Sequence, residues 1–260
     1  MCFFLWALSL PAWRLHFSFL DDAISNELMV LRWLHFVFGI IWIGLLYFFN
    51  LVGTPTMKSL EAGVRVQVYP ALMSRAMSWF RWSALVTVVV GIRYFFHLLS
   101  ADAHNAGKPS LALWWFALWA LVWSIAFELV YALQLPRKGI LDNTWVRAIG
   151  IAMVVVAAAW IVLVINGSPD SSNAHLAISV GGGLGLVMVL NTWVVVWRVQ
   201  KRLIGWMRAC AEQNTPMPAD AERMMRWGFI TARVSLWLSF PMLFFMGAAS
   251  HYPFLSTVAR

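Results

Sequence analysis

Histidine is the residue of this chain whose type and placement most favour chemistry. Four histidines lie within or at the ends of long apolar runs: His35, His97, His175 and His251. Ionisable side chains within a bilayer are costly and usually serve a function, and neutral imidazole is the commonest metal ligand in proteins. If the helices that carry them are neighbours, these rings can hold a haem b through two axial histidines. A small copper site is the weaker alternative.

The composition indicates the environment of those helices. Hydrophobic residues make up 62% of the 260 positions and charged residues only 12%, with 17 Trp and 18 Phe. A soluble domain carries about twice that share of charge. The net charge of +8 is not expected to reflect nucleic-acid binding, because no basic soluble face is visible in the sequence. The lipid bilayer is therefore the expected surroundings of most of the chain.

Apolar runs of about 20 residues, the length that crosses a hydrocarbon core as a helix, recur along the sequence. Because lipid leaves only helices or closed barrels to satisfy the backbone, we predict an all-α fold, a polytopic membrane helix bundle. Its six transmembrane helices are placed at about Glu27–Leu51, Trp79–Leu99, Leu111–Gln134, Val146–Asn166, Ala174–Trp197 and Trp227–Ser250.

Basic residues orient the bundle. The connections after the first, third and fifth spans hold most of the Lys and Arg, whereas the second holds only Lys108 with Asp102 and the fourth only Asp170. Basic loops stay in the cytoplasm, so both termini are predicted to be periplasmic. All four span-associated histidines then lie on the periplasmic side.

The rest of the chain is assigned around this transmembrane domain, which covers residues 27–254. Residues 1–26, apolar but interrupted by Pro11 and Arg14, are expected to form an interfacial segment on the outer face. Residues 200–226 are expected to form an amphipathic cytoplasmic hairpin, and residues 255–260 a short tail.

Several polar or small residues inside the spans can serve either a cofactor or the packing of the helices. His35, Gly39 and Trp42 share one helix face, which favours either a flat ring beside Gly39 or ordinary helix packing. Arg93 is expected to extend outward, as an interface anchor or as a partner of a haem propionate. Structural pairing is expected for Glu128 with Arg233, an interhelical hydrogen bond for Asn191, and close packing for the glycines at 181–183 and 185.

Three segments resemble one family. The run from Leu31 to Asn50 (LRWLHFVFGIIWIGLLYFFN), the close Phe240–Met246 followed by Ser250-His-Tyr-Pro, and the helix from His175 through Gly185 to Asn191 are similar to bacterial membrane urate hydroxylases. The similar part of those proteins is their membrane portion, the urate oxidase N-terminal domain. The similarity extends over about residues 27–254, and its most specific element is the terminal Ser-His-Tyr-Pro.

The resemblance implies a redox protein of the bacterial inner membrane that passes electrons to a cytochrome c. It also implies that His35, His175 and His251 are the metal ligands. In the family the cytochrome is usually fused at the C-terminus, so here we expect a separate periplasmic cytochrome c. The family has a His-Asn pair early in its last span, where this chain reads Val234-Ser-Leu-Trp-Leu-Ser, so urate oxidation is not expected.

Three functions remain open at this point. The first is a haem-bearing membrane redox subunit, and the second is a non-catalytic subunit that anchors or stabilises a larger membrane complex. The third, a transporter or channel, is disfavoured because the chain lacks interrupted half-helices in two matching halves.

Overall fold

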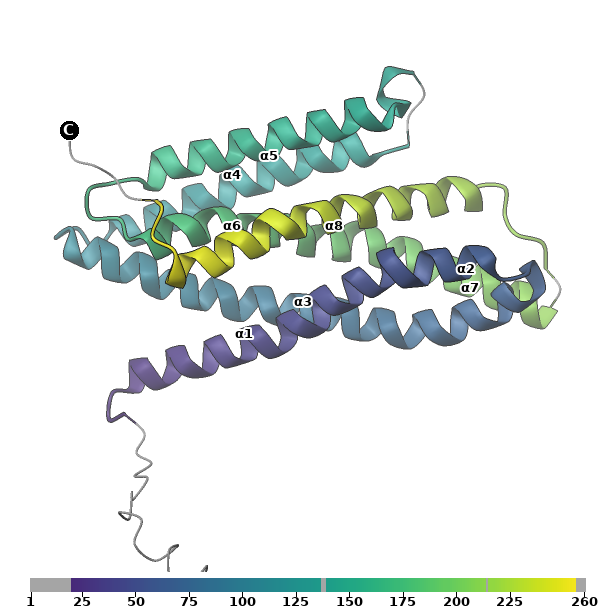
Figure 1. Cartoon of the computed structure of the whole chain (residues 1–260), viewed down its shortest axis with the longest axis horizontal. Coiled ribbons are helices and arrows are strands. Elements are labelled where there is room, and N and C mark those ends of the chain that lie inside the picture. Colours follow the sequence, from purple (N-terminus) through teal and green to yellow (C-terminus); the bar gives the residue numbers. More distant parts are fainter. Residues whose placement is uncertain (1–19, 137–138, 214, 256–260) are drawn as a thin grey trace, which may run out of the picture.

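The computed structural model describes residues 20–136, 139–213 and 215–255, and every regular element in that part is helical. Six helical stretches are long and apolar enough to cross a membrane, which confirms the predicted all-α bundle of six spans. The two described ends of the chain lie at the same end of the bundle (Figure 1). Residues 1–19 of the expected interfacial segment, and 256–260 of the tail, lie outside the described residues.

The described residues form eight α-helices and three short elements, of which η3 lies between two of the six stretches. In chain order these are α1 (Ala23–Tyr47), the π-helical η2 (Phe48–Gly53), α2 (Thr54–Ser59), α3 (Ala62–Asn105), α4 (Leu111–Gln134), the 3₁₀ turn η3 (Ile140–Asp142), α5 (Thr144–Asn166), α6 (Asn173–Leu190), the π-helical η4 (Asn191–Val196), α7 (Trp197–Gln213) and α8 (Ala221–His251).

Short polar side chains cap the N-termini of three of these helices, because they accept hydrogen bonds from backbone N–H groups that have no partner within the helix. Asp22 accepts from the amides of Ile24 and Ser25 at the start of α1, and the Ser25 hydroxyl and the two amides hold the pKa of Asp22 below its ordinary value. Asn143 caps α5 in the same way. Ser172 caps α6 by accepting from the amide of His175.

Two helical stretches are far longer than the sequence predicts. At 1.5 Å per residue, the 44 residues of α3 extend about 66 Å, roughly twice the hydrocarbon thickness. The ends predicted from the sequence, Trp79 and Leu99, mark where hydrophobicity falls. The helix continues beyond them, and its polar part packs against α7. Arg65 and Arg75 therefore lie on a helix instead of in a loop.

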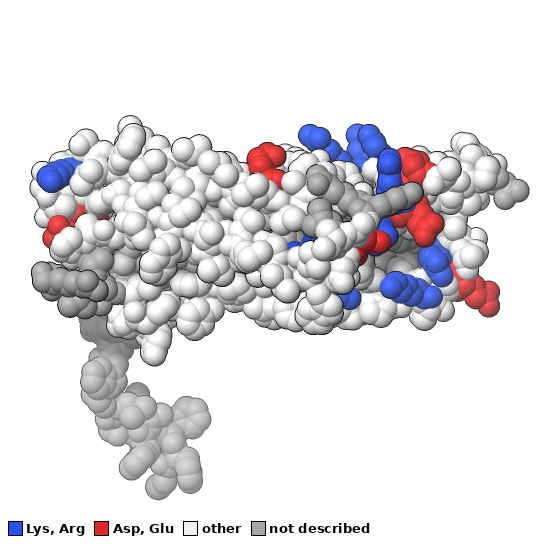
Figure 2. Space-filling view, turned by 90° about the horizontal axis from the view of Figure 1, so that it is seen from above, with Lys and Arg blue, Asp and Glu red and all other residues white. Residues whose placement is uncertain are grey.

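The expected hairpin at 200–226 consists of helical extensions of two spans. The stretch from α6 through η4 to α7 is continuous up to Gln213, and α8 begins at Ala221. Figure 2 shows Lys and Arg side chains gathered toward this end of the molecule, beside a surface with few charges. That distribution agrees with the charge asymmetry from which the orientation was predicted.

The helix α6 is the centre of the bundle. It packs against α3, α4, α5 and α8, and the most apolar part of its span, Asn173–Gln213, is two thirds buried. The expected close packing of its glycines is confirmed at two positions: a Cβ on Gly183 would lie 1.9 Å from the Trp123 indole, and one on Gly181 would lie 3.0 Å from Phe245 Cβ. A Cβ on Gly185 meets nothing within 4 Å.

Polar side chains join the inner parts of the helices. The expected interhelical bond of Asn191 is present, because its amide nitrogen donates to the Ser235 hydroxyl of α8 at 3.3 Å. Asn50 in η2 also donates to α8, to the Ala232 carbonyl at 3.3 Å. Both asparagines lie in π-helical turns, so each widened turn faces α8.

Gly183→Ala should strongly destabilise the bundle, because the added methyl would overlap Trp123. Overpacking costs about 1–3 kcal/mol, and we expect a loss at or above the upper end. The matched control, Gly185→Ala, should leave stability unchanged within about 0.5 kcal/mol or raise it slightly, since alanine favours helix. Unfolding in detergent measures both, and equal effects of the two substitutions would contradict this packing.

Candidate functional site

His175 occupies the most enclosed polar position among the expected site residues. It lies in the first turn of α6, three residues after the Ser172 cap, and none of its surface is exposed. Its Nδ1 lies 3.0 Å from Oδ2 of Asp102, a buried residue near the end of α3. The capping turn of α6 thus places the imidazole directly against a carboxylate from another helix.

The Asp102 carboxylate sets the tautomer of His175. The same Oδ2 atom accepts from the amide of Ser172 at 2.8 Å and from its hydroxyl at 3.0 Å. An oxygen that accepts two such bonds acts as an acceptor toward the imidazole too, so Nδ1 donates. In the neutral ring Nε2 then carries the lone pair, and it has no partner among the described residues.

Aromatic side chains surround this imidazole. The ring centroids of Trp115 and Phe95 lie 5.2 and 6.0 Å from that of His175. One turn further along α6, the Ser179 carbonyl accepts from the indoles of Trp119 and Trp123 at 2.8 and 3.1 Å. The imidazole is therefore fully buried beside aromatic rings, and one of its nitrogen lone pairs has no partner among the described residues.

His35 is also anchored through Nδ1, but at another place. Its Nδ1 lies 2.9 Å from the Thr87 carbonyl of α3, and a carbonyl can only accept, so Nδ1 donates here too. The glycine that admits the ring is Gly91, where a Cβ would lie 3.0 Å from the imidazole. A Cβ on Gly39 would lie 3.7 Å from Thr87 Cγ2, which is an ordinary packing contact with α3. Trp42 is buried in the core.

The remaining candidates lie toward the surface. Arg93 pairs with Glu27 of α1, with Nε 2.7 Å from Oε1 and Nη2 3.2 Å from Oε2. His97 Nε2 lies 3.3 Å from the same carboxylate. His251 is the last residue of α8 and is exposed. Arg93 therefore ties α3 to α1 instead of extending outward alone.

The structure does not bring His35 and His175 together. Thr87 and Asp102, the anchors of His35 and His175, are 15 residues apart on α3, or about 22 Å along the axis. Two ligands of one metal each bind at about 2 Å, so these imidazoles do not reach opposite faces of one haem. Across the described residues, no three His, Cys, Asp or Glu side chains are placed to share a metal ion, so the expected set of His35, His175 and His251 is not assembled.

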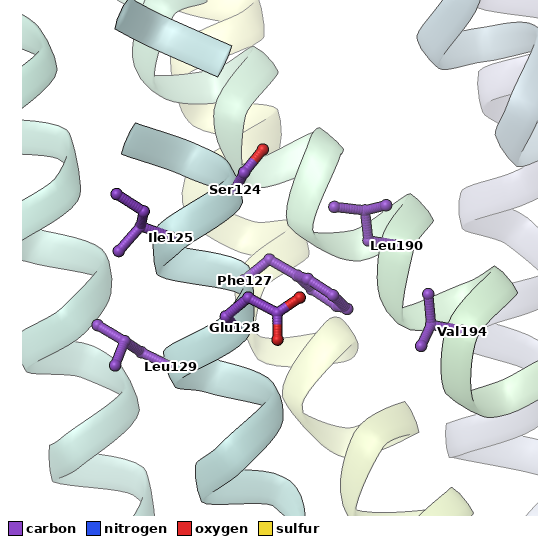
Figure 3. A pocket seen from close by; sticks show the side chains of 7 residues that line it. All are labelled: Ser124, Ile125, Phe127, Glu128, Leu129, Leu190 and Val194. Carbon is purple, nitrogen blue, oxygen red and sulfur yellow. The ribbon is translucent and has the colours of Figure 1, made fainter. Parts of the chain in front are cut away.

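Glu128 does not form the expected pair with Arg233. Within the described part of the chain it has no ion pair or side-chain hydrogen bond, whereas Arg233 lies over the Phe229 ring at 5.2 Å. Figure 3 shows the Glu128 carboxylate beside Phe127 in a groove between α4 and η4. The groove holds about 500 Å³ and is lined by Ser124, Ile125, Phe127, Glu128, Leu129, Leu190 and Val194.

Asp102 is the important residue that the sequence analysis missed. It was assigned to an outer loop because apolar character ends near Leu99, yet α3 continues to Asn105. The available signal was an acid and a histidine at the outer ends of two different spans.

Comparison of the chain with protein-family models, with curated proteins and with solved structures gave no match.

Asp102→Asn should destabilise the protein, since it weakens three hydrogen bonds to one buried oxygen. Bonds to charged groups contribute about 1.5–3 kcal/mol each and are not additive, so we expect a total loss of about 2–4 kcal/mol. Glu128→Gln is the matched control, a carboxylate-to-amide change with no bonded partner, and should change stability little. Denaturation in detergent tests both, and a neutral Asp102→Asn would contradict the described site.

Proposed function

We propose that this integral membrane protein is a redox subunit in which His175 binds the iron of a haem b near the outer end of the bundle. Electrons then pass to a separate cytochrome c. The observation that carries the proposal is the His175 ring itself: Nδ1 is bound to a carboxylate, and Nε2 is buried without a partner among the described residues. Metal-binding histidines have this arrangement, in which a second partner fixes the ring and increases its basicity.

The residues present fit one protein ligand of such an iron. His175 would supply the axial nitrogen, whereas His35 is bound to the Thr87 carbonyl and His97 lies against Glu27. A haem would provide one-electron transfer at this position. The resemblance of the spans to the membrane portion of urate hydroxylases also supports a redox role, without urate as the substrate.

The surrounding residues have defined tasks in this proposal. Asp102 holds the tautomer with the lone pair on Nε2, and Ser172 holds Asp102 through two hydrogen bonds. Trp115 and Phe95 keep water from the imidazole. Axial ligand basicity and burial are among the main means by which a protein sets a haem potential, and here they depend on residues of α3, α4 and α6.

A second function is favoured by the Glu128 groove. A carboxylate inside a span costs free energy unless it has a partner, and Glu128 has none within the described chain. A helix of another membrane subunit that brings a hydrogen-bond donor would supply one. On this reading the chain is a non-catalytic subunit that anchors or stabilises a larger membrane complex.

Absorption spectra of the purified protein, oxidised and reduced, separate the two functions. The redox proposal predicts a Soret band that is lost in His175→Ala and retained in His104→Ala, which removes an exposed histidine at the same end. A clean preparation without a Soret band, or an unchanged band in His175→Ala, contradicts it. A haem-free protein in a larger assembly that survives detergent favours the second function.

The proposal also requires the His175 end to face the periplasm. A membrane-impermeant maleimide added to intact cells should label Lys108→Cys in a Cys2→Ser, Cys210→Ser background. It should not label Cys210 in the Cys2→Ser variant, because Cys210 lies at the basic end of the bundle. The reverse pattern of labelling would place the site on the cytoplasmic side and contradict transfer to a periplasmic cytochrome.

A further inference from the structure

A second hollow lies at the basic end of the bundle. It has a volume of about 370 Å³ and lies where α4 ends and where α7 and α8 approach one another. Leu135, Pro136 and Met224 form its apolar part, and Arg202, Arg223, Asp220 and Trp227 its polar part. The hollow is thus partly apolar and partly cationic.

The two arginines of this hollow have no carboxylate partner in the described part of the chain. The hydrogen bond of Arg202 of α7 goes to the Met224 sulfur, a weak acceptor, at 3.9 Å. Arg223 of α8 has no ion pair or side-chain hydrogen bond there. Nearby Arg226, in contrast, is paired with Asp142. Two guanidinium groups, each with several donors, are therefore available to one anion.

Trp227 adds a further donor and marks the depth of the hollow. Its Nε1 is shielded from solvent and has no partner among the described residues. Its ring packs edge-on against Tyr131, with centroids 5.9 Å apart. Tyr and Trp of this kind gather at the level of lipid headgroups, and Trp227 begins the apolar section of α8. The hollow therefore lies at the membrane–water boundary.

We infer that this hollow binds the phosphodiester headgroup of a membrane phospholipid. Arg202, Arg223 and the Trp227 N–H supply donors to the phosphate oxygens, and basic pockets between helices on the cytoplasmic side bind lipid headgroups in this way. Asp220 favours a headgroup that carries its own hydrogen-bond donor. Leu135, Pro136 and Met224 would contact the glycerol and the first part of the acyl chains, which favours a lipid over a free phosphate. The inference does not depend on the redox proposal.

Native mass spectrometry tests the inference. The full chain in detergent is titrated with phosphatidylglycerol or phosphatidylethanolamine. Each arginine near a lipid surface contributes about a five-fold change in affinity, so Arg202→Gln with Arg223→Gln should weaken binding about 25-fold. Arg208→Gln, an exposed arginine of α7 outside the hollow, is the matched control and should have no effect. Trp227→Phe keeps the ring, removes the N–H and should weaken binding several-fold.

Thermal unfolding of each variant confirms that it is folded before its affinity is compared. Unchanged lipid binding in the double arginine variant would overturn the inference, as would an equal loss in Arg208→Gln. Glycerophosphate added in excess should not displace the lipid. Its displacement of the lipid at comparable concentrations would assign the site to a free phosphate ester instead.

Discussion

The architecture depends on the absence of water from the bilayer core, where polar groups must find partners inside the protein. The contact between α4 and α6 shows the consequence most clearly. Two indole N–H groups, of Trp119 and Trp123, donate to the single Ser179 carbonyl, while the Ser179 hydroxyl donates to the His175 carbonyl. Gly183 is what permits the Trp123 ring to lie against α6. These contacts fix the position of α6 within the bundle.

The candidate site follows from that position. With α6 held at the centre, its first turn lies beside the end of α3, and the Ser172 cap brings His175 to Asp102. The same few residues therefore cap α6 and orient the His175 imidazole. The aromatic side chains that close the pocket are those that hold α4 against α3 and α6. A change in the packing of α6 one turn from His175 would therefore also shift the position of its imidazole ring.

Hydrophobicity and charge predict the spans, and the run of glycines predicts the close packing at Gly181 and Gly183, because each signal is visible within one segment of the sequence. Helix length beyond the membrane is not predictable in this way, since α3 and α7 extend through contacts with each other. The histidine positions along the helices were apparent, but their directions around α3 were not. His97 and Asp102 are five residues apart, so they face about 140° apart, toward α1 and α6 respectively. Glu128 and Arg233 were matched by charge alone, and the fold separates them.

The redox proposal requires Nε2 of His175 to bind a metal ion. Anomalous diffraction at the iron absorption edge, from crystals of the protein purified from its native membrane, tests it most directly. The account predicts an iron peak about 2 Å from that nitrogen, with Nδ1 still bound to Asp102. An ordered His175 with Trp115 packed against it and no anomalous peak nearby would contradict the account.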